Sequence, residues 1–362
     1  MVYICREVET EKEKELFLSL PQKLYTEYIL TQDMTLERQI LSGTHPLSKD
    51  FTIKPYIVVN TEDEIFARCV LTFYEDDSTA YIGFFESYDN FTAIESLFGR
   101  VIKECKKFSK EKIIGPYDCS FWIKYRFKVD NFDKHYTGEP YNLPYYKDLW
   151  ERYGFKVSHK YYSNQMRVPT SEDSMEKAVL RLKQMQDRGY IFRNVSNKTF
   201  DSDFRNIYDL LVRLYSSFPG YRYISESDFI SMFEKLKYIL NYDMVFVAYK
   251  DDRLAGFLVC LPNYKDLTYD IGLLNIAQIL RLRQNPKEFI ILYMGAGKEH
   301  LGLNGAFSEL VKRYLENHNC TSISALIKEG NYSGVYYRDL TVDKYNYVLM
   351  EYVLGSDNNV KT

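Results

Sequence analysis

The sequence predicts a mixed α/β fold that occurs twice along the chain, in two tandem copies. YYKDL at Tyr145–Leu149 returns as YYRDL at Tyr336–Leu340, at an offset of 191 residues (336 − 145). The same offset superposes two β-rich hairpins, Tyr56–Phe73 and Met244–Leu261. A repeat separated by about half of a 362-residue chain indicates a duplicated module. We therefore expect two tandem domains, each long enough to bury its own core.

The first half contains a regular succession of elements. A helical segment is predicted at Lys12–Leu30, with a break near Pro21. The first hairpin follows, with its two β-rich runs around the polar NTEDE. Next come an apolar strand at Ala80–Ser87, an amphipathic helix at Phe91–Phe108 and a strand at Glu111–Pro116.

The second half repeats this order. A helix is predicted at Asp201–Phe218, before the second hairpin. An apolar strand at Glu288–Gly295 leads through a glycine-rich loop to a helix at Asn304–His318, and a strand follows at Thr321–Ile327. Strand–helix–strand units of this length imply parallel pairing with right-handed crossovers, within an otherwise mixed sheet.

The boundary between the halves is predicted near residue 168. Val168–Tyr190 begins as a polar linker and continues as a helix. The expected domains are therefore 1–167 and 168–362.

Composition narrows the class of protein. The chain is 46% hydrophobic and 27% charged, which is typical of a globular protein, and its net charge of −3 does not favour a nucleic-acid partner. The charged N-terminal segment does not resemble a signal peptide, and no run approaches the roughly 18 apolar residues of a membrane span. The six cysteines and five histidines form no ligand-spaced pairs, so we expect reduced thiols, a cytoplasmic protein and no metal site.

The order of elements resembles the GNAT acyltransferase superfamily. The resemblance is carried by YYKDLWERYGFK at Tyr145–Lys156, VFVAYKDDRLAGFLV at Val245–Val259 and ALIKEGN at Ala325–Asn331. More narrowly, YIGFFESYDN, IIGPYDCS, CLPNYKDL and DKYNYVLMEYVL are similar to a bacterial branch of tandem-domain N-acetyltransferases. The resemblance implies two GNAT-like domains. It also implies transfer of an acyl group from acetyl-CoA or another acyl-CoA to a small amine or amino-acid-like acceptor.

The glycine-rich stretch MGAGKEHLGLNGAF, at Met294–Phe307, corresponds to the superfamily's coenzyme A loop, R/Q-x-x-G-x-G/A. In that register the first glycine is present, whereas Glu299 replaces the basic residue and Asn304 replaces the second glycine. Glycine lets a backbone approach a phosphate, and the N–H groups of a helix N-terminus attract anions. The alternative is a structural turn between strand and helix. The residues that the resemblance implies for cofactor binding are Tyr293, Met294, Gly295, Lys298, Gly302, Leu303, Asn304, Gly305 and Asn331.

The matching loop of the first half, ESYDNFTA, has no glycine and carries Glu86 and Asp89. Two phosphates would meet carboxylates there, so we expect the first domain to lack the usual coenzyme A site and to supply one wall of a substrate cleft. Tyr141, Tyr145 and Tyr146 are candidates to line that cleft, with domain packing as the alternative.

Acyl transfer to an amine needs a base, a polarised carbonyl and a proton for the departing thiolate. The resemblance implies Tyr337 as the proton donor, and Glu329 is the candidate base. The alternatives are packing at a domain interface for the tyrosine and ordinary surface acidity for the glutamate. Two further functional classes stay open, namely a non-catalytic binding protein that has lost its cofactor and an aminoacyl-tRNA-dependent transferase, although the acidic charge balance does not favour the second.

Overall fold

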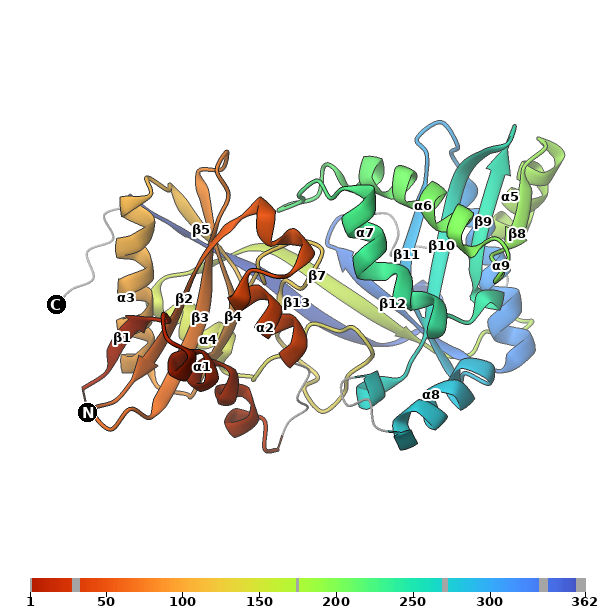
Figure 1. The fold of residues 1–362 in the computed structure, drawn as a ribbon. Helices are drawn as coiled ribbons and strands as arrows, with labels where there is room; N and C mark the ends of the chain where they lie inside the picture. Colours follow the sequence, from red (N-terminus) through yellow and green to blue (C-terminus); the bar gives the residue numbers. More distant parts are fainter. Residues whose placement is uncertain (1, 28–32, 174–175, 269–272, 332–337, 356–362) are drawn as a thin grey trace. The chain divides into compact units, whose positions relative to one another are not determined.

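The computed structural model describes residues 2–27, 33–173, 176–268, 273–331 and 338–355, and it divides the chain into two compact units (Figure 1). Unit 1 comprises Met1–Lys134, Glu139–Lys160 and Tyr347–Thr362. Unit 2 comprises His135–Gly138 and Tyr161–Asn346. The same strand order recurs in both units, with α8 as an addition between β10 and β11 of unit 2, so the predicted α/β fold built twice is confirmed.

Unit 1 contains a mixed sheet. Strands β1 to β4 pair antiparallel in sequence order, and β5 pairs parallel to β4. Residues 350–353 then pair antiparallel to β5. The strands are β1 (Ile4–Glu7), β2 (Thr52–Val59), β3 (Ile65–Phe73), β4 (Thr79–Ser87), β5 (Lys112–Gly115) and β6 (Phe127–Lys128). The helices are α1 (Glu11–Leu24), α2 (Met34–Ser42), η1 (Pro46–Asp50), α3 (Phe91–Lys107) and α4 (Tyr146–Tyr153).

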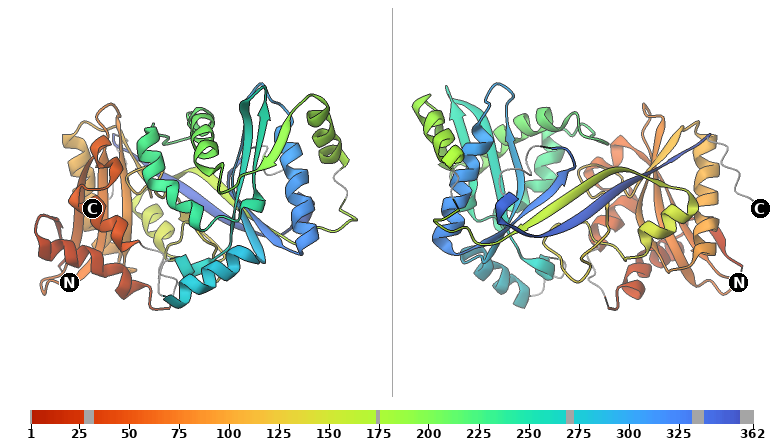
Figure 2. Two further views of the ribbon diagram at one scale, coloured as in Figure 1. Left: turned by 45° about the vertical axis from the view of Figure 1, so that its right-hand side comes forward. Right: turned by 180° about the vertical axis from the view of Figure 1, so that it is seen from behind.

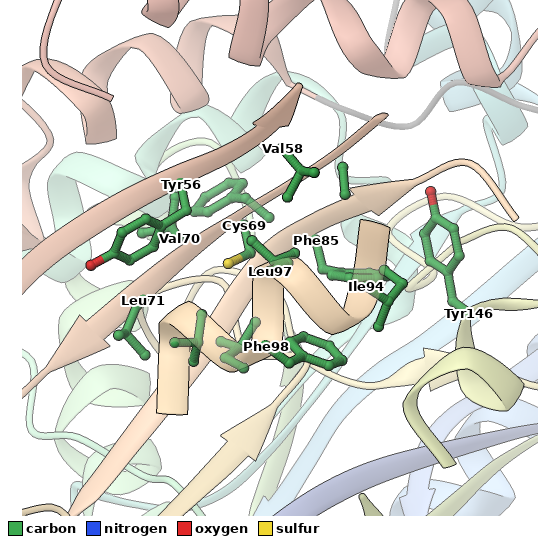
Figure 3. Close-up of a cluster of buried hydrophobic side chains, with 14 of the residues drawn as sticks. Tyr56, Val58, Cys69, Val70, Leu71, Phe85, Ile94, Leu97, Phe98 and Tyr146 are labelled. Carbon is green, nitrogen blue, oxygen red and sulfur yellow. The ribbon is translucent and has the colours of Figure 1, made fainter. Parts of the chain in front are cut away.

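The core of unit 1 forms between the sheet and α3. Asn90 caps this helix by accepting a hydrogen bond from the N–H of Ala93. Ile94, Leu97 and Phe98 repeat at helical spacing and are fully buried against the strands (Figure 3). The Trp150 ring packs edge-on against Phe98, 5.2 Å between centroids, which joins α4 to the same core.

The predicted break at Pro21 is wrong, because α1 continues through this residue to Leu24. A proline has no N–H to donate to the carbonyl four residues earlier, which here belongs to Phe17. The Arg68 guanidinium donates to that carbonyl instead, at 2.8 Å. A tertiary hydrogen bond thus replaces the one that Pro21 removes.

Unit 2 has the same sheet order. Strands β8 to β11 pair antiparallel, β12 pairs parallel to β11, and residues 161–166 pair antiparallel to β12. The strands are β8 (Ile191–Asn194), β9 (Val245–Lys250), β10 (Arg253–Pro262), β11 (Glu288–Ala296) and β12 (Thr321–Lys328). The helices are α5 (Glu176–Asp187), α6 (Phe200–Tyr215), α7 (Glu226–Phe233), η2 (Glu234–Tyr238), η3 (Tyr242–Met244), η4 (Lys265–Thr268), α8 (Leu273–Gln284), α9 (Leu303–His318) and η6 (Arg338–Leu340).

Helices cover both faces of the sheet in unit 2 (Figure 2). A side chain at Gly295 would meet Leu214 of α6, whereas one at Gly256 would meet Leu303 and Phe307 of α9. Helix α5 packs in turn against α9. The first turn of α9 is therefore held between the sheet and an additional helix.

Two long strands have residues in both units. Strand β7 (Lys156–Met166) belongs to unit 1 up to Lys160 and to unit 2 from Tyr161 onward, and β13 (Thr341–Val353) changes unit after Asn346. Strand β13, the last one that the structure describes, thus contributes to the sheet of unit 1. The two packed units therefore have other boundaries than the predicted ranges 1–167 and 168–362. Those ranges describe the extent of the duplicated sequence module and stay a prediction.

Candidate functional site

The sheet of unit 2 opens at the strand that precedes the glycine-rich loop. The parallel ladder between β11 and β12 runs from Glu288 opposite Thr321 to Ile291 opposite Ser324 and then ends. Leu292 is an extra residue relative to β10, because Tyr293 and Ile291 pair with consecutive residues of that strand. Tyr293, Met294 and Gly295 consequently lie on the part of β11 that has left the ladder with β12.

The loop after β11 presents main-chain donors at the start of α9. Gly302 is the N-cap residue and has φ +104°, a conformation that favours glycine. In the described part of the chain, the N–H groups of Leu301, Gly302, Asn304 and Gly305 donate to no acceptor. Because α9 has 16 residues, its dipole adds positive potential at the same end. This combination suits a phosphate group.

A basic side chain that the sequence analysis missed lies beside this turn. A Cβ on Gly302 would lie 2.5 Å from Cδ and 3.0 Å from Nε of Arg181 on α5. The Arg181 side chain is exposed, and its guanidinium donates to Gln184 at 3.2 Å. It therefore places a positive charge beside a loop that itself carries Glu299. No local pattern could have found it, since 121 residues (302 − 181) separate the two positions.

Glu299 itself turns back onto the loop. A Cβ on Gly297 would lie 2.8 Å from Oε1 of Glu299, and that oxygen is 3.5 Å from Nε2 of His300. His300 Nδ1 shares a hydrogen bond of 2.8 Å with the Tyr190 hydroxyl. These contacts give His300 and Glu299 a structural role in the turn.

The other predicted residues of unit 2 have differing surroundings. Tyr293 is half-buried and meets the Tyr215 ring edge-on, 6.2 Å between centroids. Leu303 is fully buried, whereas Lys298 is exposed. Glu329 and Asn331 are exposed at the end of β12. Asn304 is half-buried, and within the described residues its Oδ1 has no donor. Tyr337 lies outside the described residues.

The hydroxyl groups of the three predicted cleft tyrosines form hydrogen bonds with groups of unit 1. The Tyr146 hydroxyl donates to Glu86 at 2.6 Å and accepts from the N–H of Ser87 at 3.0 Å. The Tyr145 hydroxyl donates to the carbonyl of Ser87 at 2.8 Å. Tyr141 donates to the carbonyl of Phe132 at 2.6 Å, and it also lines a pocket of unit 1.

In unit 1, the equivalent opening is occupied by the chain itself. The β4–β5 ladder ends after Tyr81 and Ile114, but the N–H of Tyr117 then donates to Ile82 at 2.7 Å. The Asp118 carboxylate accepts from the N–H of Phe84 at 2.6 Å. A Cβ on Gly83 would lie 2.1 Å from the carbonyl oxygen of Tyr117. The Phe84 N–H at this bend of β4 is therefore already used.

Comparisons with known proteins agree with this fold. The tandem GNAT protein of the clavulanic acid biosynthesis pathway matches with a TM-score of 0.51 and 11% identity, over 98% of each chain. The GCN5-related glucosamine N-acetyltransferase region of a fungal multi-domain β-N-acetylglucosaminidase matches with a TM-score of 0.52 and 11% identity, over 97% of this chain and 38% of that one. The chain therefore has the tandem GNAT fold.

Sequence comparison adds one weak relative. Protein YghO of Escherichia coli K12 is 21% identical over 195 residues, which is 54% of this chain and half of that protein's length. No family model matches the chain. Among the helices that the structure describes, none combines the length and the apolar character needed to cross a bilayer. Among all the residues that the structure describes, no group of three histidine, cysteine, aspartate or glutamate side chains could hold a metal ion.

Proposed function

We propose that this protein is an acyl-CoA-dependent N-acyltransferase that acts on a small amine or amino-acid-like acceptor. The observation that carries the proposal is the set of main-chain donors at the start of α9, with Arg181 beside them. In unit 1 the Asp118 carboxylate takes the N–H of Phe84 on β4, the counterpart of β11, and Asn90 caps α3, the counterpart of α9. Unit 2 is therefore the half that we assign to acyl-CoA.

The pyrophosphate of acyl-CoA would be held by the N–H groups of Gly302, Asn304 and Gly305, with Arg181 and Lys298 as the cationic partners. The donor set fits this group, because N–H donors and guanidinium groups are the partners that phosphates prefer in proteins. Asn304 can present its amide NH₂, since the two ends of that group exchange by rotation. The backbone from Tyr293 to Gly295, where β11 has left the ladder, would receive the chain that carries the thioester, and Asn331 is assigned to the same site.

The proposed role of the loop in binding acyl-CoA is tested by reversing the charge at Arg181. Arg181→Glu should weaken acetyl-CoA binding at least tenfold, because a charge-assisted hydrogen bond contributes about 1.5–3 kcal/mol. The readout is the rise in melting temperature with increasing acetyl-CoA, since a ligand of the native state stabilises it.

Lys183→Glu is the matched control, because it makes the same charge change at an exposed position on the same helix. Its thermal shift should equal that of the wild type. A wild-type protein that no acyl-CoA stabilises at millimolar concentration would overturn the assignment, as would equal losses in the two variants.

Glu329 and Tyr337, which follow β12 in the sequence, are the residues that we assign to proton transfer. Bound acyl-CoA supplies a thioester whose C–S bond breaks as the acceptor's C–N bond forms. Glu329 would take the proton of the attacking amine, and Tyr337 would give a proton to the departing thiolate. The exposure of Glu329 leaves it accessible to an acceptor.

Glu329→Gln and Tyr337→Phe should each lower kcat by about 10²–10⁴-fold, the usual contribution of a general acid or base. Release of the coenzyme A thiol from acetyl-CoA, in the presence of a panel of amines and amino acids, measures the rate. The acetyl-CoA thermal shift should stay unchanged in both variants. Wild-type rates in either one would remove that residue from the mechanism, and a chain that binds acetyl-CoA without turnover would be a binding protein.

A further inference from the structure

Unit 1 contains a polar pocket that the proposed acyl-CoA site does not use. Its lining combines acidic and basic side chains with the rings of Phe84, Phe85 and Phe127. It lies beside the opening that Tyr117 and Asp118 fill, and β4 contributes Phe84, Phe85 and Glu86 to its wall. Figure 3 shows Phe85 and Tyr146 in the neighbouring core.

Three buried carboxyl groups line this pocket, namely Glu37, which pairs with Arg68, and Glu86 and Asp118. Glu86 is 4% exposed, and its two oxygens accept from the hydroxyls of Tyr146 at 2.6 Å and Tyr25 at 3.4 Å. Asp118 is 6% exposed, and its Oδ2 is 3.8 Å from Nζ of Lys124. Burial raises the pKa of the Glu86 and Asp118 carboxyl groups. Arg68 beside Glu86 and Lys124 beside Asp118 lower these pKa values, but by less than burial raises them. Buried carboxyl groups are costly unless hydrogen bonds satisfy them, and an ammonium group of a ligand would bring three further donors to Glu86 and Asp118.

Cationic donors line the same pocket. Arg68 is fully buried, and Glu37 binds its two terminal nitrogens at 2.6 and 2.9 Å. Its Nε is buried and, within the described residues, has no acceptor. Lys124 and Arg126 are further positive groups in the wall. A buried guanidinium N–H without an acceptor favours a ligand that carries a carboxylate.

We propose that this pocket binds a small zwitterion of the amino-acid class. The ligand's ammonium group meets Glu86 and Asp118, and its carboxylate meets the cationic donors Arg68, Lys124 and Arg126. An acyl thioester does not suit the pocket, because the neighbouring sheet opening is filled and three carboxyl groups line the wall. The inference does not depend on acyl transfer, since the binding is measured without acyl-CoA.

Isothermal titration of the full chain with L-serine, L-leucine and L-phenylalanine tests the proposal. Each amino acid is compared with its decarboxylated amine and with the acid that lacks the amino group. At least one amino acid should bind, and its two truncated analogues should bind at least tenfold more weakly, because each lacks one set of charged hydrogen bonds. Absence of binding by all three amino acids at millimolar concentration would overturn the proposal, as would an analogue that binds equally well.

Variants then place the ligand in this pocket. Glu86→Gln keeps the shape of the side chain and should weaken binding of the amino acid at least tenfold. Glu104→Gln is the matched control, because Glu104 is also 4% exposed in unit 1 but pairs with Lys54 and Lys107 outside the pocket. Equal affinities in the two variants would show that the ligand lies elsewhere. The acetyl-CoA thermal shift should survive Glu86→Gln, so failure of this site is distinguishable from failure of the acyl-CoA site.

Discussion

A fragment of residues 1–167 will not form a stable domain, although it contains the whole first copy of the repeat. The fragment lacks β13, whose residues 350–353 pair with β5. It also loses Tyr347, Val348 and Met350, which are 0%, 6% and 0% exposed. Burial of each such side chain contributes about 1.5–3 kcal/mol. Together they approach the roughly 5–15 kcal/mol of a typical domain.

Urea unfolding of the fragment, followed by circular dichroism, should show no cooperative transition. Joining 341–355 to the fragment through a flexible linker should restore one, because the missing strand is then present at high effective concentration. Cooperative unfolding of 1–167 alone, with stability close to that of the joined chain, would contradict the assignment of β13 to unit 1.

Lys128→Met should lower the free energy of unfolding by about 3–5 kcal/mol, the usual cost of breaking a buried ion pair. Lys128 Nζ lies 2.8 Å from Oε1 of Glu139, and the two side chains are 0% and 1% exposed. Burial lowers the pKa of Lys128, although Glu139 opposes the shift. The substitution leaves the Glu139 carboxylate buried without this cation, while the Tyr347 hydroxyl still donates to it.

The double variant Lys128→Met/Glu139→Leu should recover most of the loss, because apolar side chains can replace a buried pair at little net cost. Lys147→Met is the control, since Lys147 and Glu151 form a partly exposed pair at 2.6 Å that should contribute about 0–1 kcal/mol. Urea titration of the variants in the full chain gives the free energies. Equal losses in Lys128→Met and Lys147→Met would show that burial does not govern the first pair.

The position of the glycine-rich loop, which we propose as the coenzyme A site, could be predicted from sequence because its signals are local. A strand, glycines and an amphipathic helix follow one another within Glu288–His318, and β11 and α9 form there. The cationic side chain beside the loop could not be predicted from sequence, since Arg181 belongs to another helix, α5. The carboxyl of Asp118, which takes the main-chain donor in unit 1, lies 34 residues from Phe84 in the chain.

Local patterns are enough to specify the duplicated order of strands and helices, because hydrophobic period and turn residues act over a few positions. By contrast, the place of β13, the last described strand, in unit 1 follows from packing of the folded chain. The pairing of β5 with β13 depends on which strand edges meet in the folded chain. The hydrophobic pattern of a strand shows which of its faces is buried, but it does not show which other strand lies beside it. The same holds for Arg68, which pairs with Glu37 and replaces the hydrogen bond lost at Pro21, because these groups come together only when the chain is packed.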